Sequence, residues 1–172
     1  GKPECGMYTL LLIDPDAPSR IHPDMREQVN WVVSNIPQDK VTEGEYVLSY
    51  QTPAPAFSSG LHRCIFSLFK QKRAFSQQEL QNQREFFAPR SGLHTYEWVK
   101  SQSDILHNVP VGVEAFLSEW DPTVDAVHKA TGYLPPSQYL SPSQKRAQLS
   151  QSVGKSAFSL FSPRAGVGET DA

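Results

Sequence analysis

The sequence predicts a mainly β fold, a β-sandwich with a few peripheral helices. Its first half holds short runs of β-branched and aromatic residues, which strands favour. Clusters of Pro, Gly, Asp and Ser separate these runs, as turns separate the strands of an antiparallel sheet. The expected strands cover residues 8–13, 31–34, 46–50 and 64–69.

The segments between and after these strands have clear signals of their own. Residues 51–60 predict a loop, because Pro53 and Pro55 cannot sit in a central strand. Ser76 and Glu79 have the spacing of a capping box, and residues 80–87 contain no helix breaker, so a helix is predicted there. A second short helix is expected over residues 94–100.

The last part of the domain predicts a strand followed by a helix. Residues 110–117 form the expected strand. Asp121 can then cap a helix that has Pro122 at its first position and Gly132 just past its end. We expect His128 to be a partly buried histidine on the face of this helix rather than a ligand.

Composition limits the class of protein. A chain of 172 residues with 38% apolar content suits one domain with a sizeable core. The formal net charge of −2 argues against a surface that coats nucleic acid everywhere, although it allows a local basic patch. No apolar run approaches the roughly 20 residues that a membrane span needs. The sequence therefore predicts no membrane span.

Signals for catalysis, cofactors or metals are weak. The chain has no G-x-S-x-G elbow, no H-E-x-x-H motif and no phosphate loop. Cys5 and Cys64 form no C-x-x-C pair, and Cys64 fits a small core residue inside a strand better than a nucleophile. We expect no enzyme activity, no cofactor and no bound metal.

Two motifs place polar side chains next to strands. Residues 14–20 read Asp-Pro-Asp-Ala-Pro-Ser-Arg directly after the first strand, and residues 60–63 read Gly-Leu-His-Arg directly before another. The prolines stop the first strand, since proline lacks an N–H donor and holds the preceding residue extended. Asp14, Asp16, His62 and Arg63 are therefore expected to converge at one rim of a sheet. Such a group suits an anion, but it also suits a purely structural ion-pair network.

These motifs resemble the two signatures of the phosphatidylethanolamine-binding protein (PEBP) family, and the resemblance covers roughly residues 8–131. It implies a β-sandwich with a small anion pocket at one end. It also implies that the N-terminal strands of that sandwich are missing from this chain. The pocket residues implied by the resemblance are Asp14, Asp16, Pro18, Asn30, Pro55, Gly60, His62 and Arg63.

The chain departs from the family pattern at the pocket. Members that bind ligands usually have a histidine where this chain has Asn30, and often a tyrosine where it has Cys64. Asparagine can form hydrogen bonds, but it cannot carry the positive charge that favours phosphate in a small site. We therefore expect a weakened pocket that binds phosphorylated groups poorly.

Several short segments, among them residues 35–37, 41–44 and 69–71, together with Pro135, Pro136 and the basic residues that follow, resemble one branch of the family. This branch is the PEBP-fold protein of the mitochondrial large ribosomal subunit. The resemblance implies a mitochondrial location, with the cytoplasm as the alternative. It implies ribosomal proteins and rRNA as partners.

The C-terminal extension is polar and mildly basic. It divides the chain into a PEBP-like domain at 1–134 and an extension at 135–172. Ser, Gln and Pro dominate it, so we expect disorder when it stands alone. One helical face is nevertheless possible and can dock on its own domain or on a partner. The residues expected to contact a partner are Lys145, Arg146, Val153, Lys155, Leu160 and Phe161.

The sequence thus predicts a non-enzymatic PEBP-like protein, with a structural subunit of the mitochondrial large ribosomal subunit as the main hypothesis. The alternative is a free-standing PEBP that binds phospholipid headgroups or phosphorylated ligands and regulates kinases or proteases.

Overall fold

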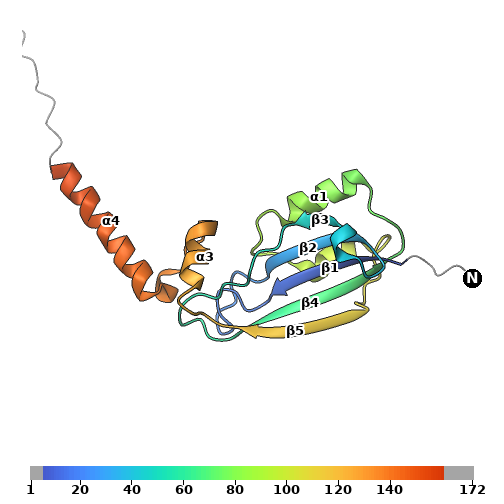
Figure 1. Ribbon diagram of the computed structural model, residues 1–172, viewed down its shortest axis with the longest axis horizontal. Coiled ribbons are helices and arrows are strands. Elements are labelled where there is room, and N and C mark those ends of the chain that lie inside the picture. The colour runs from blue at the N-terminus through green and yellow to red at the C-terminus, as the bar shows by residue number, and fades with distance from the viewer. Residues whose placement is uncertain (1–5, 161–172) are drawn as a thin grey trace, which may run out of the picture.

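The computed structural model describes residues 6–160 (Figure 1). Within them lies one antiparallel sheet of five strands in the order β3-β2-β1-β4-β5. The four strand runs expected in the first half are confirmed, and so is the late strand. The strands are β1 (Met7–Asp14), β2 (Gln28–Pro37), β3 (Glu45–Leu48), β4 (His62–Gln71) and β5 (Gly112–Ser118).

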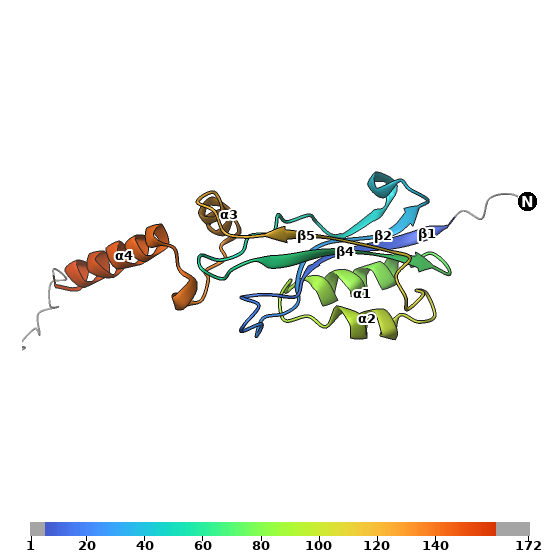
Figure 2. The same cartoon turned by 90° about the horizontal axis from the view of Figure 1, so that it is seen from below.

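Two helices cover one face of this sheet, α1 (Gln77–Phe87) and α2 (Thr95–Ser101) (Figure 2). The predicted capping box is present at the start of α1. Ser76 Oγ accepts a hydrogen bond from the Glu79 N–H, and the Glu79 carboxylate accepts one from the Ser76 N–H. Both expected helices are therefore confirmed.

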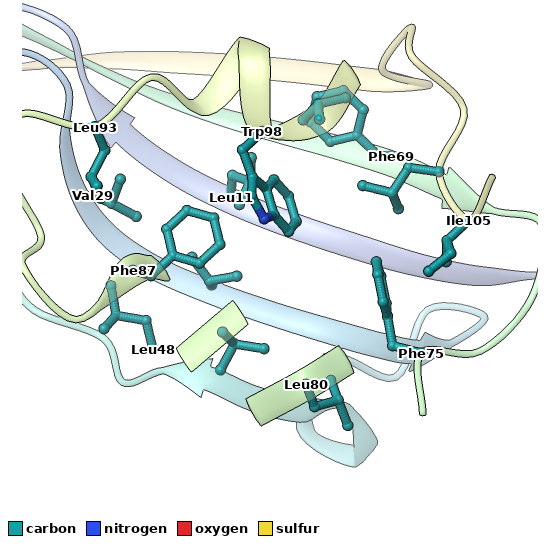
Figure 3. Close-up of a cluster of buried hydrophobic side chains, with 14 residues drawn as sticks. Leu11, Val29, Leu48, Phe69, Phe75, Leu80, Phe87, Leu93, Trp98 and Ile105 are labelled. Atoms are coloured by element: carbon teal, nitrogen blue, oxygen red, sulfur yellow. The ribbon is translucent and has the colours of Figure 1, made fainter. Parts of the chain in front are cut away.

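The hydrophobic core fills the space between these helices and the sheet (Figure 3). Leu11 from central strand β1 is 2% exposed, and Phe87 from α1 is 0% exposed. The Phe87 ring lies edge-on to Trp98 of α2, with 4.8 Å between the ring centroids. Because side chains of a strand alternate between its two faces, the neighbours of Leu11 point to the opposite face.

That opposite face of the sheet has no second sheet among residues 6–160. The expected mainly β fold with peripheral helices is confirmed, and the described part of the chain forms an open sheet. Helix α1 and helix α2 both lie on the other side (Figure 2). An aromatic row crosses the uncovered face through ring contacts between Trp31 and both Tyr46 and Tyr50, and between Phe66 and Phe116.

We expect this face to drive self-association of the chain at tens of micromolar, because Tyr46 and Phe116 are 47% and 40% exposed. Sedimentation velocity measures this. Replacing Tyr46 and Phe116 with serine should shift the population toward monomer. Val113→Ser, on the other face of β5, is the matched control and should leave the population unchanged. A monodisperse wild-type monomer would contradict the expected self-association.

Two more helices follow β5, α3 (Val124–Thr131) and α4 (Pro142–Leu160). Gly132 ends α3 in the left-handed conformation (φ 71°), as expected. The predicted start is wrong: α3 begins at Val124, and Asp121 instead accepts hydrogen bonds from the N–H and hydroxyl groups of Thr123 in the turn before it. The carboxylate of Asp121 caps this turn and not the helix itself. Pro122 therefore lies outside the helix.

The extension begins by packing on the domain and then projects from it (Figure 1). Tyr139 is buried, and its hydroxyl donates a hydrogen bond to Ser19 Oγ. Ser141 is 0% exposed, and its hydroxyl donates to the Asp125 carboxylate. Residues 142–160 form α4, so the possible helical face lies on a helix, and disorder of the isolated extension stays a prediction. No helix in residues 6–160 is long and apolar enough to cross a membrane.

Candidate functional site

The end of β1 and the start of β4 meet at one rim of the sheet, because the two strands are antiparallel neighbours with Ile13 opposite Ile65. This brings the two sequence motifs together as expected. The Nδ1 atom of His62 lies 2.7 Å from Asp14 Oδ2. Both side chains are buried, with His62 2% and Asp14 6% exposed.

Hydrogen bonds hold both ring nitrogens of His62. An ionised Asp14 carboxylate has only acceptors, so His62 Nδ1 donates to it. His62 Nε2 lies 2.9 Å from Ser59 Oγ, and the same hydroxyl lies 2.7 Å from the Ala56 carbonyl. His62 and Asp14 are therefore fixed by a buried chain of hydrogen bonds.

A second ion pair lies beside the first. Asp16 is 2% exposed, and its carboxylate accepts hydrogen bonds from the backbone N–H and the guanidinium of Arg63. Arg20 lies 3.7 Å away and is exposed. The hydrogen bond from the Arg63 side chain holds the pKa of Asp16 below its usual value, against the effect of burial.

The Asp16–Arg63 pair predicts a specific pH dependence. Because the folded pKa of Asp16 is lowered, the pair stabilises the fold above the unfolded pKa near 3.8 and loses this contribution as pH falls through the folded value. Asp16→Asn should lower the free energy of unfolding at pH 7 by about 1–2 kcal/mol, limited by the half-exposed Arg63. Urea unfolding should show the difference from wild type shrinking below about pH 4. A difference that grows on acidification would contradict this account.

A cavity of about 60 Å³ opens next to the His62–Asp14 pair, with space for about four water-sized groups. Strand β1 and the turn after it, strand β2, the 51–56 loop, the start of β4 and the α3 end supply its wall. The lining residues are Asp14, Ala17, Pro18, Gln28, Asn30, Gln51, Thr52, Ala54, Pro55, Ala56, His62, His128 and Tyr133.

Asn30 of β2 occupies one wall of this cavity and is 3% exposed. Its amide Nδ2 donates to the Gln51 carbonyl over 3.0 Å. Arg90 braces the same strand, since its guanidinium donates to the carbonyls of Val29 and Asn30 and to that of Ser49. Burial lowers the pKa of Arg90, whose guanidinium donates to these carbonyls and to the Ser49 hydroxyl, all neutral acceptors.

Of the predicted pocket residues, Asp14, Pro18, Asn30, Pro55 and His62 line the cavity together. The others support it. Asp16 and Arg63 pair behind the wall, and Gly60 (φ 82°) shapes the loop that leads into β4. Whether these residues bind a ligand stays a prediction.

The predicted contact residues of the extension lie elsewhere. Lys145 and Arg146 are exposed on α4, which points away from the domain (Figure 1). Val153, Lys155 and Leu160 fall within the helix, while Phe161 lies outside the described residues. Contact of these residues with a partner stays a prediction.

Sequence reasoning missed three residues of the site. His128 is 2% exposed and lines the cavity, so it is more fully buried than expected, and its role toward a ligand stays a prediction. Its Nε2 donates to the Ala54 carbonyl, and its Nδ1 accepts from Gln144 of α4. Tyr133 lies beside it, and Ser59 holds His62. Only Ser59 could have been found from the sequence, because it lies three residues before His62 in the loop that leads to the cavity.

Cys64 lies next to His62 in β4 and is 0% exposed, which confirms it as a core residue. Burial raises the pKa of its thiol to about 12, so it stays protonated at neutral pH. Within residues 6–160, no three His, Cys, Asp or Glu side chains are arranged to hold a metal ion.

Comparison with known proteins places this geometry in a family. The family model described as phosphatidylethanolamine-binding protein matches residues 2–102, a span that contains both motifs and most of the cavity wall. The chain belongs to the PEBP family. The resemblance seen in the sequence is therefore confirmed at the level of the family.

Relatives in this family include three proteins of Arabidopsis thaliana. BROTHER of FT and TFL 1 is 44% identical over 66 residues, which are 38% of this chain and 36% of that protein. TERMINAL FLOWER 1 is 45% identical over 67 residues, 38% of this chain and 37% of that protein. FLOWERING LOCUS T is 42% identical over 65 residues, which are 37% of this chain and 36% of that protein. The chain thus matches little more than a third of these relatives' length.

Two solved structures have a fold similar to that of this chain. The solution structure of CG7054 has a TM-score of 0.57 and 25% identity, covering 74% of this chain and 70% of that one. Carboxypeptidase Y inhibitor, in the crystal structure with its cognate proteinase, has a TM-score of 0.55 and 19% identity. The match covers 70% of this chain and 63% of the inhibitor chain. The second similarity shows the fold alone.

Proposed function

We propose that this chain is the ligand-binding part of a free-standing PEBP that works by binding rather than by catalysis. It holds a phospholipid headgroup or a polar group of similar size in the cavity beside His62, and it regulates a partner protein such as a kinase or protease. The observation that carries this proposal is the cavity of about 60 Å³ beside the buried pair of Asp14 and His62.

The relatives support the free-standing protein over a ribosomal subunit. Those named above are called after flowering, and none of them is a ribosomal protein. The ribosomal hypothesis rests on the resemblance of short segments and on exposed Lys145 and Arg146 alone.

A deletion that tests the extension in ribosome assembly should begin after Gln144. Ser141 and Gln144 must be kept, because they form hydrogen bonds with Asp125 and His128 of the domain.

The non-enzymatic proposal needs an argument, because Asp14, His62 and Ser59 are bonded in the order of an acid–base–nucleophile triad. In a catalytic triad the serine donates its proton to the histidine. Here the Ser59 hydroxyl also lies 2.7 Å from the Ala56 carbonyl, which competes with His62 for its proton. Ser59 is also 8% exposed and does not line the cavity. The group is arranged as a scaffold.

A serine-reactive fluorophosphonate probe tests this point. The probe should leave the chain unlabelled, because no base activates Ser59. Labelling that disappears in Ser59→Ala but persists in the exposed Ser58→Ala variant would show a working nucleophile and end the non-enzymatic proposal.

Ligand binding is tested by NMR titration with glycerophosphoethanolamine, glycerophosphocholine and inorganic phosphate. At least one headgroup diester should shift the resonances of pocket residues saturably. Because Asn30 carries no charge, phosphate alone should bind no tighter than about millimolar, close to −4 kcal/mol. Ala54→Leu, which places a larger side chain on the cavity wall, should abolish headgroup binding, whereas Ala130→Leu on the exposed side of α3 should not. Pocket shifts from none of the headgroups would refute the proposal.

A further inference from the structure

Strand β5 forms one edge of the sheet. It pairs with β4 on one side, and no strand within residues 6–160 pairs with its other side (Figure 1). An edge strand presents a row of backbone N–H and C=O groups to which another strand can bind. Natural edge strands are often short or charged, whereas β5 has seven residues and Glu114 as its only charge. The β5 edge is therefore suited to pairing.

The hydrogen bonds of β4 show which backbone groups of β5 face this open edge. Successive residues of an antiparallel strand direct their N–H and C=O groups to opposite sides. The C=O groups of Leu68 and Lys70 accept bonds from Val111 and His107, so the even-numbered residues of β4 face β5. They pair with the even-numbered residues of β5. The residues of β5 that face the open edge are Val113, Ala115 and Leu117.

The backbone of Ala115 supports this direction. Its N–H donates to the Glu114 carboxylate over 3.2 Å, whereas an N–H that faced β4 would donate to that strand. Glu114 thus covers the central donor of the edge. A pairing strand that supplies a C=O to Ala115 replaces the Glu114 carboxylate, which then becomes available to a cation.

Side chains along the edge determine which strand fits. Val113 and Leu117 are each 60% exposed on the face that carries α1 and α2, so apolar residues at every second position of a neighbouring strand would cover them. Residues 109–121 contain three acidic residues and no Lys or Arg. Two copies of β5 side by side would bring these carboxylates together without a cation. Charge complementarity therefore favours a basic strand from another protein over a second copy.

We propose that the β5 edge binds an extended segment of a partner protein, which adds a strand to the sheet. The segment pairs antiparallel with β5 and has apolar residues at every second position, with a Lys or Arg opposite Glu114. No residue of β5 lines the cavity beside His62. The inference therefore goes beyond the proposed function, and a failure of headgroup binding leaves it standing.

The probe is the peptide Thr-Val-Thr-Val-Lys-Val-Thr, amidated and labelled with fluorescein at its N-terminus. Its central Val is placed opposite Ala115, which puts its Lys opposite Glu114. Fluorescence anisotropy with the full chain should show saturable binding. The analogue with Glu in place of Lys should bind at least tenfold more weakly. Absence of saturable binding, or equal binding of the two peptides, would overturn the inference.

Methylation of the peptide backbone tests the pairing without a change to the protein. An N-methyl group on the central Val removes the N–H that faces Ala115 and should weaken binding at least tenfold. The same group on the Lys removes an N–H that points away from β5 and should leave binding within about threefold. Equal effects of the two methylations would refute pairing at the edge.

A charge reversal in the protein assigns the selectivity. Glu114→Lys should reverse the preference, so that the Glu peptide binds more tightly than the Lys peptide. Glu85→Lys makes the same charge change on the exposed surface of α1 and should leave the preference as it is in wild type. An unchanged preference in Glu114→Lys would refute the role of Glu114.

Ala115→Pro separates a partner strand from a second copy. Proline removes the outward N–H but breaks no bond to β4, so the fold should persist while peptide binding weakens at least tenfold. Sedimentation velocity should show the same self-association of Ala115→Pro and wild type. If Ala115→Pro instead converts an oligomer to monomer, a second copy occupies the edge and the proposed partner is wrong.

Discussion

Asp14→Ala is expected to lower the free energy of unfolding by about 3–5 kcal/mol, the usual cost of removing one partner of a buried ion pair. The His62 imidazole is 2% exposed and loses the acceptor for its Nδ1–H. The Asp16 N–H loses its 2.8 Å bond to Asp14 Oδ1 at the same time. Urea unfolding at pH 7 measures the change. Asp24→Ala, in the exposed turn between β1 and β2, should cost less than about 0.5 kcal/mol.

A double-mutant cycle with His62→Ala isolates the pair. Once His62 is absent, removal of Asp14 should cost less, because no buried imidazole N–H is left without its acceptor. Equal costs of Asp14→Ala with and without His62 would contradict a coupling between the two side chains.

Phe87→Ala should lower the free energy of unfolding by a similar amount, about 3–5 kcal/mol, because it opens a large void in the core. The Phe87 ring is 0% exposed and contacts the rings of Trp98 and Phe86 edge-on, at centroid distances of 4.8 and 4.9 Å. The contact with Trp98 joins α1 to α2 (Figure 3). Chemical denaturation followed by tryptophan fluorescence measures the loss of stability, with Trp98 as one of the three tryptophans that contribute to the signal.

The neighbouring residue provides the control. Phe86 is 37% exposed on the same helix, so Phe86→Ala removes the same atoms from a partly solvated position. It should cost clearly less than Phe87→Ala. Equal costs would mean that α1 does not bury its Phe87 face as the structure shows.

Local signals in the sequence were enough for most of the secondary structure. The capping box of Ser76 and Glu79 predicted α1, and alternating β-branched and aromatic runs predicted the strands. These signals act between residues near in sequence, so they survive without knowledge of the fold. The start of α3 was missed because two local options competed, and Asp121 caps the turn before the helix instead of the helix.

The sequence by itself determined the family, the strands and the convergence of Asp14 with His62, because a motif after one strand and a motif before its antiparallel neighbour must share a rim. Only the tertiary structure decided what completes the cavity. His128, Tyr133 and Asn30 come from segments far apart in the chain. Helical periodicity can predict that His128 lies on the buried face of its helix. It cannot predict which cavity that face lines. The hydrogen bonds that hold His62 likewise depend on Ser59 and Ala56, which come together only once the loop is folded.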